Sequence, residues 1–209
     1  MEKGKFITFE GPDGSGKTTV SKAVCERLSK EGYAVQYTRE PGGSDIAEQI
    51  RKIILDPANT DMDVRTEALL YAASRRQHLM DIVLPALKSG NNIISDRFVD
   101  SSLAYQGYGR EIGMDEVYAI NQFAIEGHMP DKTIFLNIDA ETGLKRINAN
   151  RSYLDRLDQE SVAFHQRVHE GYQKVIEKYA DRMIMIDASK ETDEVIKKAY
   201  LAVKGILDA

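Results

Sequence analysis

A phosphate-binding loop is the strongest chemical signal in the chain. Residues 9–20 read FEGPDGSGKTTV and contain the pattern G-x-x-x-x-G-K-[ST]. Its glycines let the backbone turn tightly, so that successive N–H groups can point at an anion. Lys17 adds a positive charge, and the hydroxyl of Thr18 can ligate Mg²⁺. We therefore expect a nucleoside triphosphate such as ATP to be bound by Gly11, Pro12, Asp13, Gly14, Ser15, Gly16, Lys17 and Thr18.

An acidic residue and an arginine follow a second apolar segment. Residues 91–97 read NNIISDR and put Asp96 where a protein with such a loop needs a carboxylate near its Mg²⁺. Arg97 comes next, and an arginine beside the phosphates can bridge donor and acceptor groups. A lone acidic residue at a strand end is often only a cap, but the pair predicts a metal ligand and a phosphate contact.

The segment TEALLYAASRRQHLM predicts a long helix with Tyr71 and Arg75 four residues apart. This spacing puts both side chains on one helix face. A planar ring beside a forked donor would suit a nucleobase. An ordinary amphipathic helix with an exposed arginine explains the spacing equally well.

Three arginines, Arg146, Arg151 and Arg156, lie in the polar segment RINANRSYLDRLDQE. Such a cluster is usually a solvated helix face. However, the variable positions of the phosphate loop contain no arginine, and phosphoryl transfer benefits from an extra cation. We therefore expect a mobile lid at about residues 146–157 that brings an arginine over the triphosphate and excludes water.

The elements that position these residues alternate between strand-like and helical patterns. Alternation of this kind predicts parallel strands joined by right-handed crossovers. We predict an α/β fold, a three-layer P-loop NTPase sandwich whose five-stranded parallel sheet is flanked by helices. Ligands gather at the carboxyl ends of such strands, so the loops after the first three should face one cleft. The expected strands are 6–10, 34–38, 92–96, 133–137 and 183–186.

Composition limits the remaining classes. With 209 residues, of which 42% are hydrophobic and 29% charged, the chain suits a single domain over residues 1–209. The net charge of −5 argues against a general nucleic-acid binder. No apolar run is long enough to cross a membrane, and the start MEKGK lacks a secretion signal, so we expect a cytoplasmic protein.

Five blocks together resemble the bacterial thymidylate kinase family, in the same order and over essentially the whole chain. The resemblance implies that ATP, with Mg²⁺, gives its γ-phosphoryl group to the 5′-phosphate of dTMP. The product would be dTDP, on the route to dTTP. The resemblance also implies a homodimer. The blocks are FEGPDGSGKTT, TREPGGS, ALLYAASRRQH, SDRFVDSSLAYQGYGR and LDRLDQES.

The resemblance also implies roles around the acceptor nucleotide. Asp13 would accept a hydrogen bond from the 3′-hydroxyl of the sugar. Glu40 and Pro41 would form the acceptor-side turn, with a cis peptide bond between them. Tyr71 would stack on the thymine, and Arg75 would donate a hydrogen bond to a thymine carbonyl.

Further acceptor contacts follow from the same blocks. Ser102 and Gln106 would meet the edge of the base, and Leu55 would help to wall the pocket. Tyr105 would crowd the 2′ position of the sugar and so favour deoxyribose. Arg97 would hold the acceptor phosphate. One base methyl changes binding by only about 1 to 3 kcal/mol, so rejection of dUMP would be incomplete.

Members of the family carry a catalytic arginine either in the phosphate loop or in the lid. This chain resembles the second type, and Arg156, inside the matched block LDRLDQES, is the first choice. The expected catalytic set is then Lys17, Arg97 and Arg156, with Thr18 and Asp96 at the metal.

Two other functions share parts of this pattern. A deoxynucleoside kinase would need a carboxylate that takes a proton from a neutral 5′-hydroxyl, and Glu10 is the candidate for that role. A nucleotide-dependent switch of the guanine-specific kind normally has an N-K-x-D element, and the sequence contains no Asn-Lys pair.

Overall fold

The computed structural model describes residues 3–150 and 155–209. The strands are β1 (Phe6–Glu10), β2 (Val35–Arg39), β3 (Asn92–Asp96), β4 (Lys132–Asn137) and β5 (Met183–Asp187). The helices before β3 are α1 (Lys17–Lys30), α2 (Asp45–Leu55), α3 (Val64–His78), the π-helical turn η1 (Leu79–Val83) and α4 (Leu84–Lys88). Those after β3 are α5 (Val99–Ser102), the π-helical stretch η2 (Leu103–Gly109), α6 (Met114–Ile125), α7 (Ala140–Asn150), α8 (Val162–Lys178), the short 3₁₀ turn η3 (Ala180–Arg182) and α9 (Thr192–Leu207).

The five strands form one parallel sheet in the order β2-β3-β1-β4-β5. In the register of this sheet Asp96 lies beside both Phe9 and Arg39. The carboxyl ends of the first three strands are therefore level, as a shared cleft requires. The predicted α/β fold and five-stranded parallel sheet are confirmed, and each predicted strand matches the observed one to within one residue.

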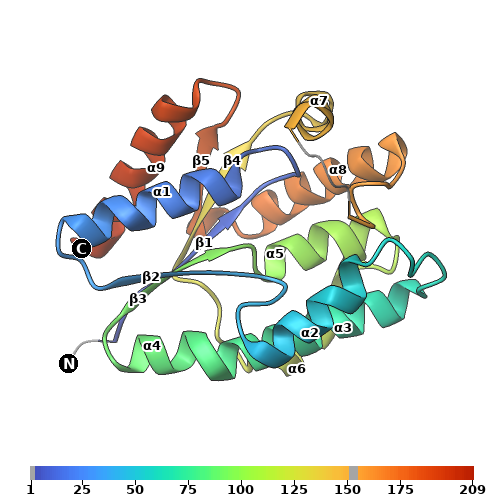
Figure 1. Cartoon of the computed structure of the whole chain (residues 1–209), viewed down its shortest axis with the longest axis horizontal. Coiled ribbons are helices and arrows are strands. Elements are labelled where there is room, and N and C mark those ends of the chain that lie inside the picture. Colours follow the sequence, from blue (N-terminus) through green and yellow to red (C-terminus); the bar gives the residue numbers. More distant parts are fainter. Residues whose placement is uncertain (1–2, 151–154) are drawn as a thin grey trace.

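Helices cover both faces of the sheet (Figure 1). Successive strand residues point to opposite faces, so Ile94 packs with α1 and α9, whereas Ile93 packs with α3, α4 and α6. In β4, Ile134 belongs to the first layer and Phe135 meets η2 and α8 in a third cluster. These apolar clusters hold the strand ends, and hence the site, in fixed positions.

The last helix closes the core, as its apolar spacing predicts. In α9 the side chains of Val195, Ala199 and Val203 are almost fully buried on the face of the sheet that α1 also covers. They recur every four residues, and this spacing keeps them on one helix face. Across the described residues we find no helix with the length and apolar character needed to span a membrane.

Candidate active site

The phosphate loop lies between the end of β1 and the start of α1, at the carboxyl edge of the sheet (Figure 1). This is the strand-loop-helix order that the sequence predicts. Gly14 has a φ of 77°, and a Cβ there would lie 2.2 Å from the carbonyl oxygen of Gly143 in α7. Glycine is therefore required at this position both for the backbone conformation and for the close approach of α7.

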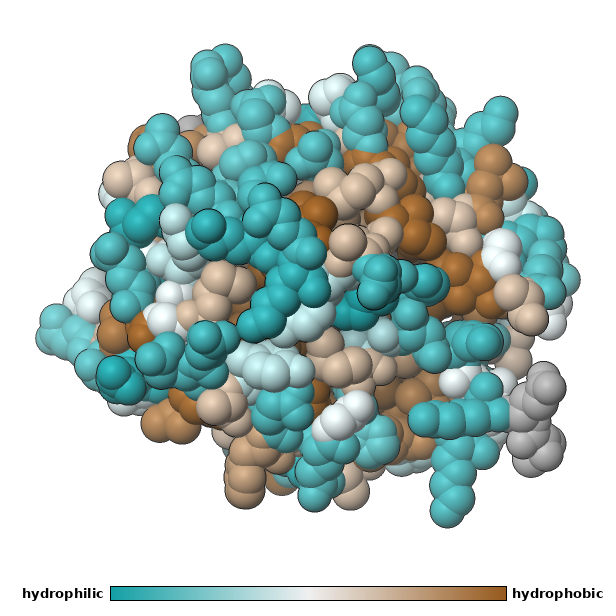
Figure 2. All heavy atoms as spheres, turned by 180° about the vertical axis from the view of Figure 1, so that it is seen from behind, coloured by the Kyte–Doolittle hydropathy of each residue, from teal (hydrophilic) through white to brown (hydrophobic). Residues whose placement is uncertain are grey.

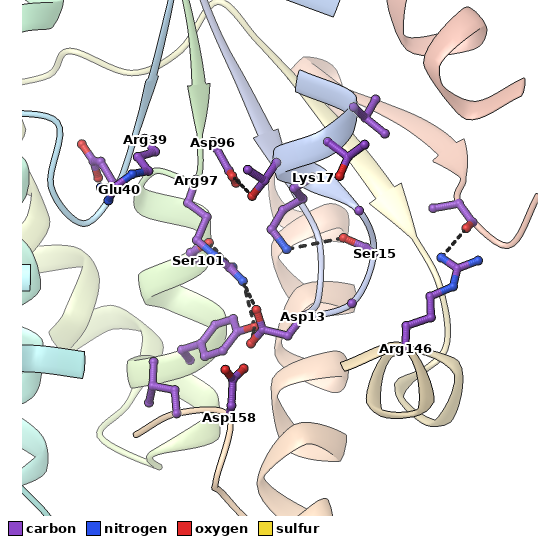
Figure 3. Close-up of a pocket in the computed structure, with 18 of the residues that line it drawn as sticks. Asp13, Ser15, Lys17, Arg39, Glu40, Asp96, Arg97, Ser101, Arg146 and Asp158 are labelled. Atoms are coloured by element: carbon purple, nitrogen blue, oxygen red, sulfur yellow. Dashed lines mark hydrogen bonds and ion pairs between the residues drawn. The ribbon is translucent and has the colours of Figure 1, made fainter. Parts of the chain in front are cut away.

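Lys17, the first residue of α1, folds back toward its own loop. Its Nζ donates to the carbonyl oxygen of Pro12 at 2.9 Å and lies 3.4 Å from Oγ of Ser15 (Figure 3). Burial, assisted by the charge of Arg97, lowers the pKa of Lys17 to about 8. A bound polyphosphate would favour the protonated form, so the loop is suited to an anion.

Thr18 and Asp96 come together as the sequence predicts. Oγ1 of Thr18 donates to Oδ2 of Asp96 at 2.5 Å, joining α1 to the end of β3. Mg²⁺ prefers oxygen ligands and usually keeps phosphate oxygens and water in its shell. Among the residues that the structure describes, no cluster of three or more His, Cys, Asp or Glu could hold a metal. The two oxygens of the pair fit an ion whose other ligands are phosphate oxygens and water.

A cavity of about 570 Å³ opens at this edge of the sheet. Its phosphate end is formed by residues 14–18 and Arg97, and its helical end by Leu55, Tyr71 and Gln106. The predicted residues in its lining are Asp13, Gly14, Ser15, Gly16, Lys17, Thr18, Glu40, Pro41, Leu55, Tyr71, Asp96, Arg97, Tyr105 and Gln106. The other predicted residues lie outside the lining: Gly11, Pro12, Arg75, Ser102 and Arg156.

Arg97 follows β3 in a left-handed backbone conformation, with a φ of 74°. Its guanidinium group extends into the cavity toward Asp13 (Figure 3). Nη2 donates to Oδ1 of Asp13 at 2.5 Å, and Nη1 donates to the hydroxyls of Ser101 and Tyr172 at 2.9 and 3.0 Å. A non-glycine residue rarely adopts this conformation, so the surrounding contacts must hold the turn that aims Arg97.

Tyr105 stands beside the same carboxylate. Its hydroxyl donates to Oδ2 of Asp13 at 2.6 Å and accepts from Nη2 of Arg97 at 3.2 Å. The ring packs edge-on against Phe164 and Tyr172 of α8. The two residues predicted to meet the sugar are thus neighbours in the structure.

Glu10 is fully buried behind Arg97 and does not line the cavity. Its carboxylate accepts from the backbone N–H groups of Phe98 and Ser101 at 2.7 and 3.2 Å, and from the hydroxyls of Ser101 and Tyr172 at 2.6 and 3.1 Å. Burial and the charge of Asp100 raise the pKa of Glu10 to about 7, although Arg97 pulls it down. Glu10 therefore fixes both the turn and the hydroxyls that hold Arg97.

The peptide bond between Glu40 and Pro41 is cis, as the resemblance implies. The carboxylate of Glu40 is buried and accepts from Nε of Arg75 at 2.7 Å, and it lies 2.9 Å from Nδ1 of His78. These contacts join the turn at Glu40 and Pro41 to α3.

Arg75 is almost fully buried, and its guanidinium group is already engaged. A guanidinium has five N–H donors. Besides Nε, Nη1 donates to Ser102 at 3.0 Å and to Asn121, and Nη2 donates to the carbonyl oxygen of Phe98 at 3.0 Å. These bonds use four of the five donors. Contact of Arg75 or Ser102 with a base stays a prediction.

Arg156 lies at the helical end of the cavity, outside its lining. Nη2 donates to Oε2 of Glu67 at 2.5 Å, and Nε donates to the carbonyl oxygen of Ile54 at 2.8 Å. Its action on a triphosphate stays a prediction. Arg146 lines the other side of the phosphate loop and donates to the carbonyl oxygen of Ala188 (Figure 3). Arg151 and part of the expected lid lie outside the described residues.

Several lining residues were missed by the sequence reasoning. Arg39 is the last residue of β2, and Ser189 and Lys190 follow β5, so their places at the carboxyl ends of strands could have identified them. Arg51 of α2 also lines the cavity and donates to the carbonyl oxygen of Pro41 at 2.8 Å. No local pattern distinguishes Arg51 from other helix arginines.

A parallel α/β sheet with a G-x-x-x-x-G-K-T loop opening α1 defines a P-loop nucleotide-binding protein. The model of the thymidylate kinase family matches residues 9–199, and the chain belongs to this family. It is 58% identical over 205 residues to thymidylate kinase from Bacillus velezensis, covering 98% of this chain and 97% of that one. Thymidylate kinases from Geobacillus sp. (strain WCH70) and Clostridium novyi (strain NT) are each 55% identical, with coverage of at least 96% of both chains.

Proposed function

We infer that this protein is a kinase that transfers the γ-phosphoryl group of ATP to dTMP and releases dTDP. Its membership of the thymidylate kinase family over residues 9–199 supports this function. The structural observation that carries it is a single cavity whose lining includes both the phosphate loop and the predicted acceptor residues Tyr71 and Gln106. Donor and acceptor nucleotides can therefore meet without an intervening barrier.

The phosphate end supplies the groups for transfer. The loop N–H groups and Lys17 would hold the donor phosphates, and Arg97 would hold the acceptor phosphate. Thr18 and Asp96 would hold Mg²⁺, which neutralises developing negative charge on the phosphate oxygens when bound. The contact of Arg97 with Asp13 at the cavity wall supports an acceptor phosphate and a sugar lying side by side.

The sugar and base would lie toward the helical end. Asp13 would accept from the 3′-hydroxyl, and Tyr105, bonded to the same carboxylate, would leave little room for a 2′-hydroxyl. Tyr71 would stack on the thymine ring, while Gln106 would meet its edge. All four side chains line the same cavity, which supports these roles.

The buried position of Glu10 argues against a nucleoside acceptor. A nucleoside kinase needs a base at the 5′-hydroxyl, but the Glu10 carboxylate is occupied by four donors behind Arg97. A phosphate acceptor is already ionised and needs no such base.

A homodimer is the proposed assembly. Many of the large exposed apolar side chains lie on α2, α3, η1 and α6. Helices α2, α3 and α6 lie near one another (Figure 1), and η1 continues from α3. The surface seen from behind mixes hydrophilic and apolar areas (Figure 2). Phe123 of α6 is 89% exposed, and large exposed apolar side chains mark association surfaces. Light scattering should therefore report twice the chain mass. Besides Phe123, the large exposed apolar side chains of α2, α3 and η1 are Ile46, Ile53, Val64, Leu69 and Met80.

We also place the protein in the cytoplasm, because its proposed substrates ATP and dTMP are soluble nucleotides that it would take up directly.

The function is tested by measuring ADP release from ATP and Mg²⁺ with dTMP, dUMP, dCMP, AMP, UMP and thymidine supplied separately. We expect strong preference for dTMP, with dUMP next because a methyl group contributes little to discrimination. Activity with thymidine alone would replace the proposal with a nucleoside kinase. ADP release that does not depend on any acceptor would indicate a hydrolytic switch.

A further inference from the structure

Glu67 is a buried carboxylate that the proposed reaction does not use. It lies on α3, one helical turn before Tyr71, and its side chain is 1% exposed. Oε1 accepts from Nε2 of Gln106 at 2.9 Å, while Oε2 accepts from Arg110 at 3.0 Å and from Arg156 at 2.5 Å. A buried negative charge is tolerated here because both carboxylate oxygens accept hydrogen bonds, including bonds from two arginines.

These bonds determine the ionisation state of Glu67. Burial alone would raise the pKa of Glu67, but the charge and hydrogen bonds of Arg110, with those of Gln106 and Arg156, hold it below its ordinary value. At neutral pH the group is a carboxylate, which accepts hydrogen bonds and cannot donate them.

An acceptor-only neighbour fixes the side-chain amide of Gln106. Only Nε2 can donate to Glu67, so the two ends of the amide are not interchangeable here. With Nε2 held by Glu67, Oε1 would be the end of the amide left for a ligand in the cavity that Gln106 lines. Rotating the amide by 180° would put Oε1 against the carboxylate and lose the bond.

We propose that Glu67 is a specificity-determining residue that fixes Gln106 as a hydrogen-bond acceptor toward the base, so that the pocket selects a pyrimidine with an N3–H group. Thymine and uracil carry this donor. Cytosine has an unprotonated N3, which would face Oε1 of Gln106 acceptor to acceptor. The proposal rests on the placement of the base at Gln106 in the proposed function.

The cost of accepting cytosine follows from the same geometry. Either the cytosine N3 faces an acceptor without a proton between them, or Gln106 rotates and faces Glu67 in the same unfavourable way. A buried polar group left without its partner is costly. Glu67 therefore acts through Gln106 and is a positioning residue that does not touch the substrate itself.

The test compares kcat/KM for dTMP, dUMP and dCMP in wild type and in Glu67→Gln. A glutamine at position 67 can donate or accept, so Gln106 can adopt either orientation. We expect the dTMP-to-dCMP ratio to fall by roughly ten-fold or more, while the dTMP-to-dUMP ratio stays the same because both bases carry N3–H. An unchanged dTMP-to-dCMP ratio in a folded variant would overturn the proposal.

Arg110→Gln is the matched control. It removes one cation from Glu67 but leaves the carboxylate on Gln106. We expect lower stability but an unchanged dTMP-to-dCMP ratio. A fall of this ratio equal to that in Glu67→Gln would assign the effect to a general loosening of α3 and overturn the specificity role.

Gln106→Leu separates this proposal from the base placement on which it rests. If the base lies at Gln106, this variant lowers the dTMP-to-dCMP ratio whatever Glu67 does. A ratio that responds to Gln106→Leu but not to Glu67→Gln would overturn the role of Glu67 alone. If neither variant changes the ratio, the base lies elsewhere and both statements are wrong.

A measurement on the unaltered protein applies even if Glu67→Gln does not fold. In ¹⁵N-glutamine-labelled protein, the side-chain NH₂ signal of Gln106 is assigned by its loss in Gln106→Leu. We expect slow exchange with solvent and little shift on addition of dTMP, because Nε2 stays on Glu67. Rapid exchange, or a large shift of this signal with dTMP, would contradict the proposal.

Discussion

At the phosphate end of the cavity, Lys17 begins a helix and Arg97 follows a strand, and both cations line the space that a ligand would fill. At the helical end, Arg75 and Arg156 are buried against Glu40 and Glu67 and lie outside the lining. Cationic side chains therefore serve two purposes around one cavity. Lys17 and Arg97 line the space that a ligand would fill, whereas Arg75 and Arg156 neutralise buried carboxylates beside it.

This comparison predicts that substitutions at the phosphate end reduce the rate while those at the helical end reduce stability. Lys17→Ala should have the largest effect, lowering kcat by about 100- to 1,000-fold, because a charge aimed at the transferred group is lost. ADP release with saturating ATP and dTMP measures this. The exposed Lys30 on the same helix is the control, and Lys30→Ala should keep wild-type kcat. A wild-type rate in Lys17→Ala would refute the assignment of the loop.

Arg75→Leu, at the helical end, should instead destabilise the folded protein. Removing the guanidinium leaves the buried carboxylate of Glu40 without its cation. We expect the free energy of unfolding, measured by urea titration, to fall by about 3 to 5 kcal/mol. Arg76→Leu removes a neighbouring surface ion pair with Glu126 and should cost less than about 1 kcal/mol. Equal stability of the two variants would contradict the structural role of Arg75.

Glu10→Gln sharpens the comparison, because Glu10 is a buried carboxylate at the phosphate end. The folded protein keeps the Glu10 proton up to about pH 7, whereas an unfolded Glu loses it near 4.5. Between these values the native state binds more protons, so this group makes the wild type less stable as pH rises. Across that window the stability of Glu10→Gln relative to wild type should rise by about 3 kcal/mol, measured by urea unfolding at pH 4, 5, 6, 7 and 8.

The exposed Glu177 of α8 gives a control for this pH dependence. Glu177→Gln should track wild type at every pH. If the stability of Glu10→Gln relative to wild type is also the same at every pH, the pKa of Glu10 is not raised in the folded protein, and this prediction is wrong.

The fold and the phosphate end could be predicted because their signals are local. Lys17, Asp96 and Arg97 stand within one or two residues of a strand or helix boundary, so the order of elements places them. The contacts of the helical end join residues far apart in the chain: 89 positions separate Arg156 from Glu67, and 102 separate it from Ile54. The spacing of apolar residues indicates that a helix has a buried face. It does not indicate which distant carboxylate an arginine on that helix will contact.

The buried partners of Arg75 illustrate this limit. A tyrosine and an arginine four residues apart do share a face of α3, and Tyr71 does line the cavity. The fixed tilt of the helix nevertheless directs Arg75 inward, where Glu40, Ser102 and Asn121 accept its hydrogens. Ser101, which the sequence analysis did not single out, accepts a hydrogen bond from Arg97.

The close approach of Gly14 and Gly143 matters for anyone transplanting this site into another scaffold. A Cβ on Gly143 would lie 2.5 Å from the carbonyl oxygen of Asp13, so the two backbones touch with no side chain between them. The first turn of α7 therefore packs directly against the phosphate loop and helps to fix its conformation. A graft of residues 9–20 alone would transfer the motif without the helix that packs against it. Both the loop and the first turn of α7 must therefore be transferred together.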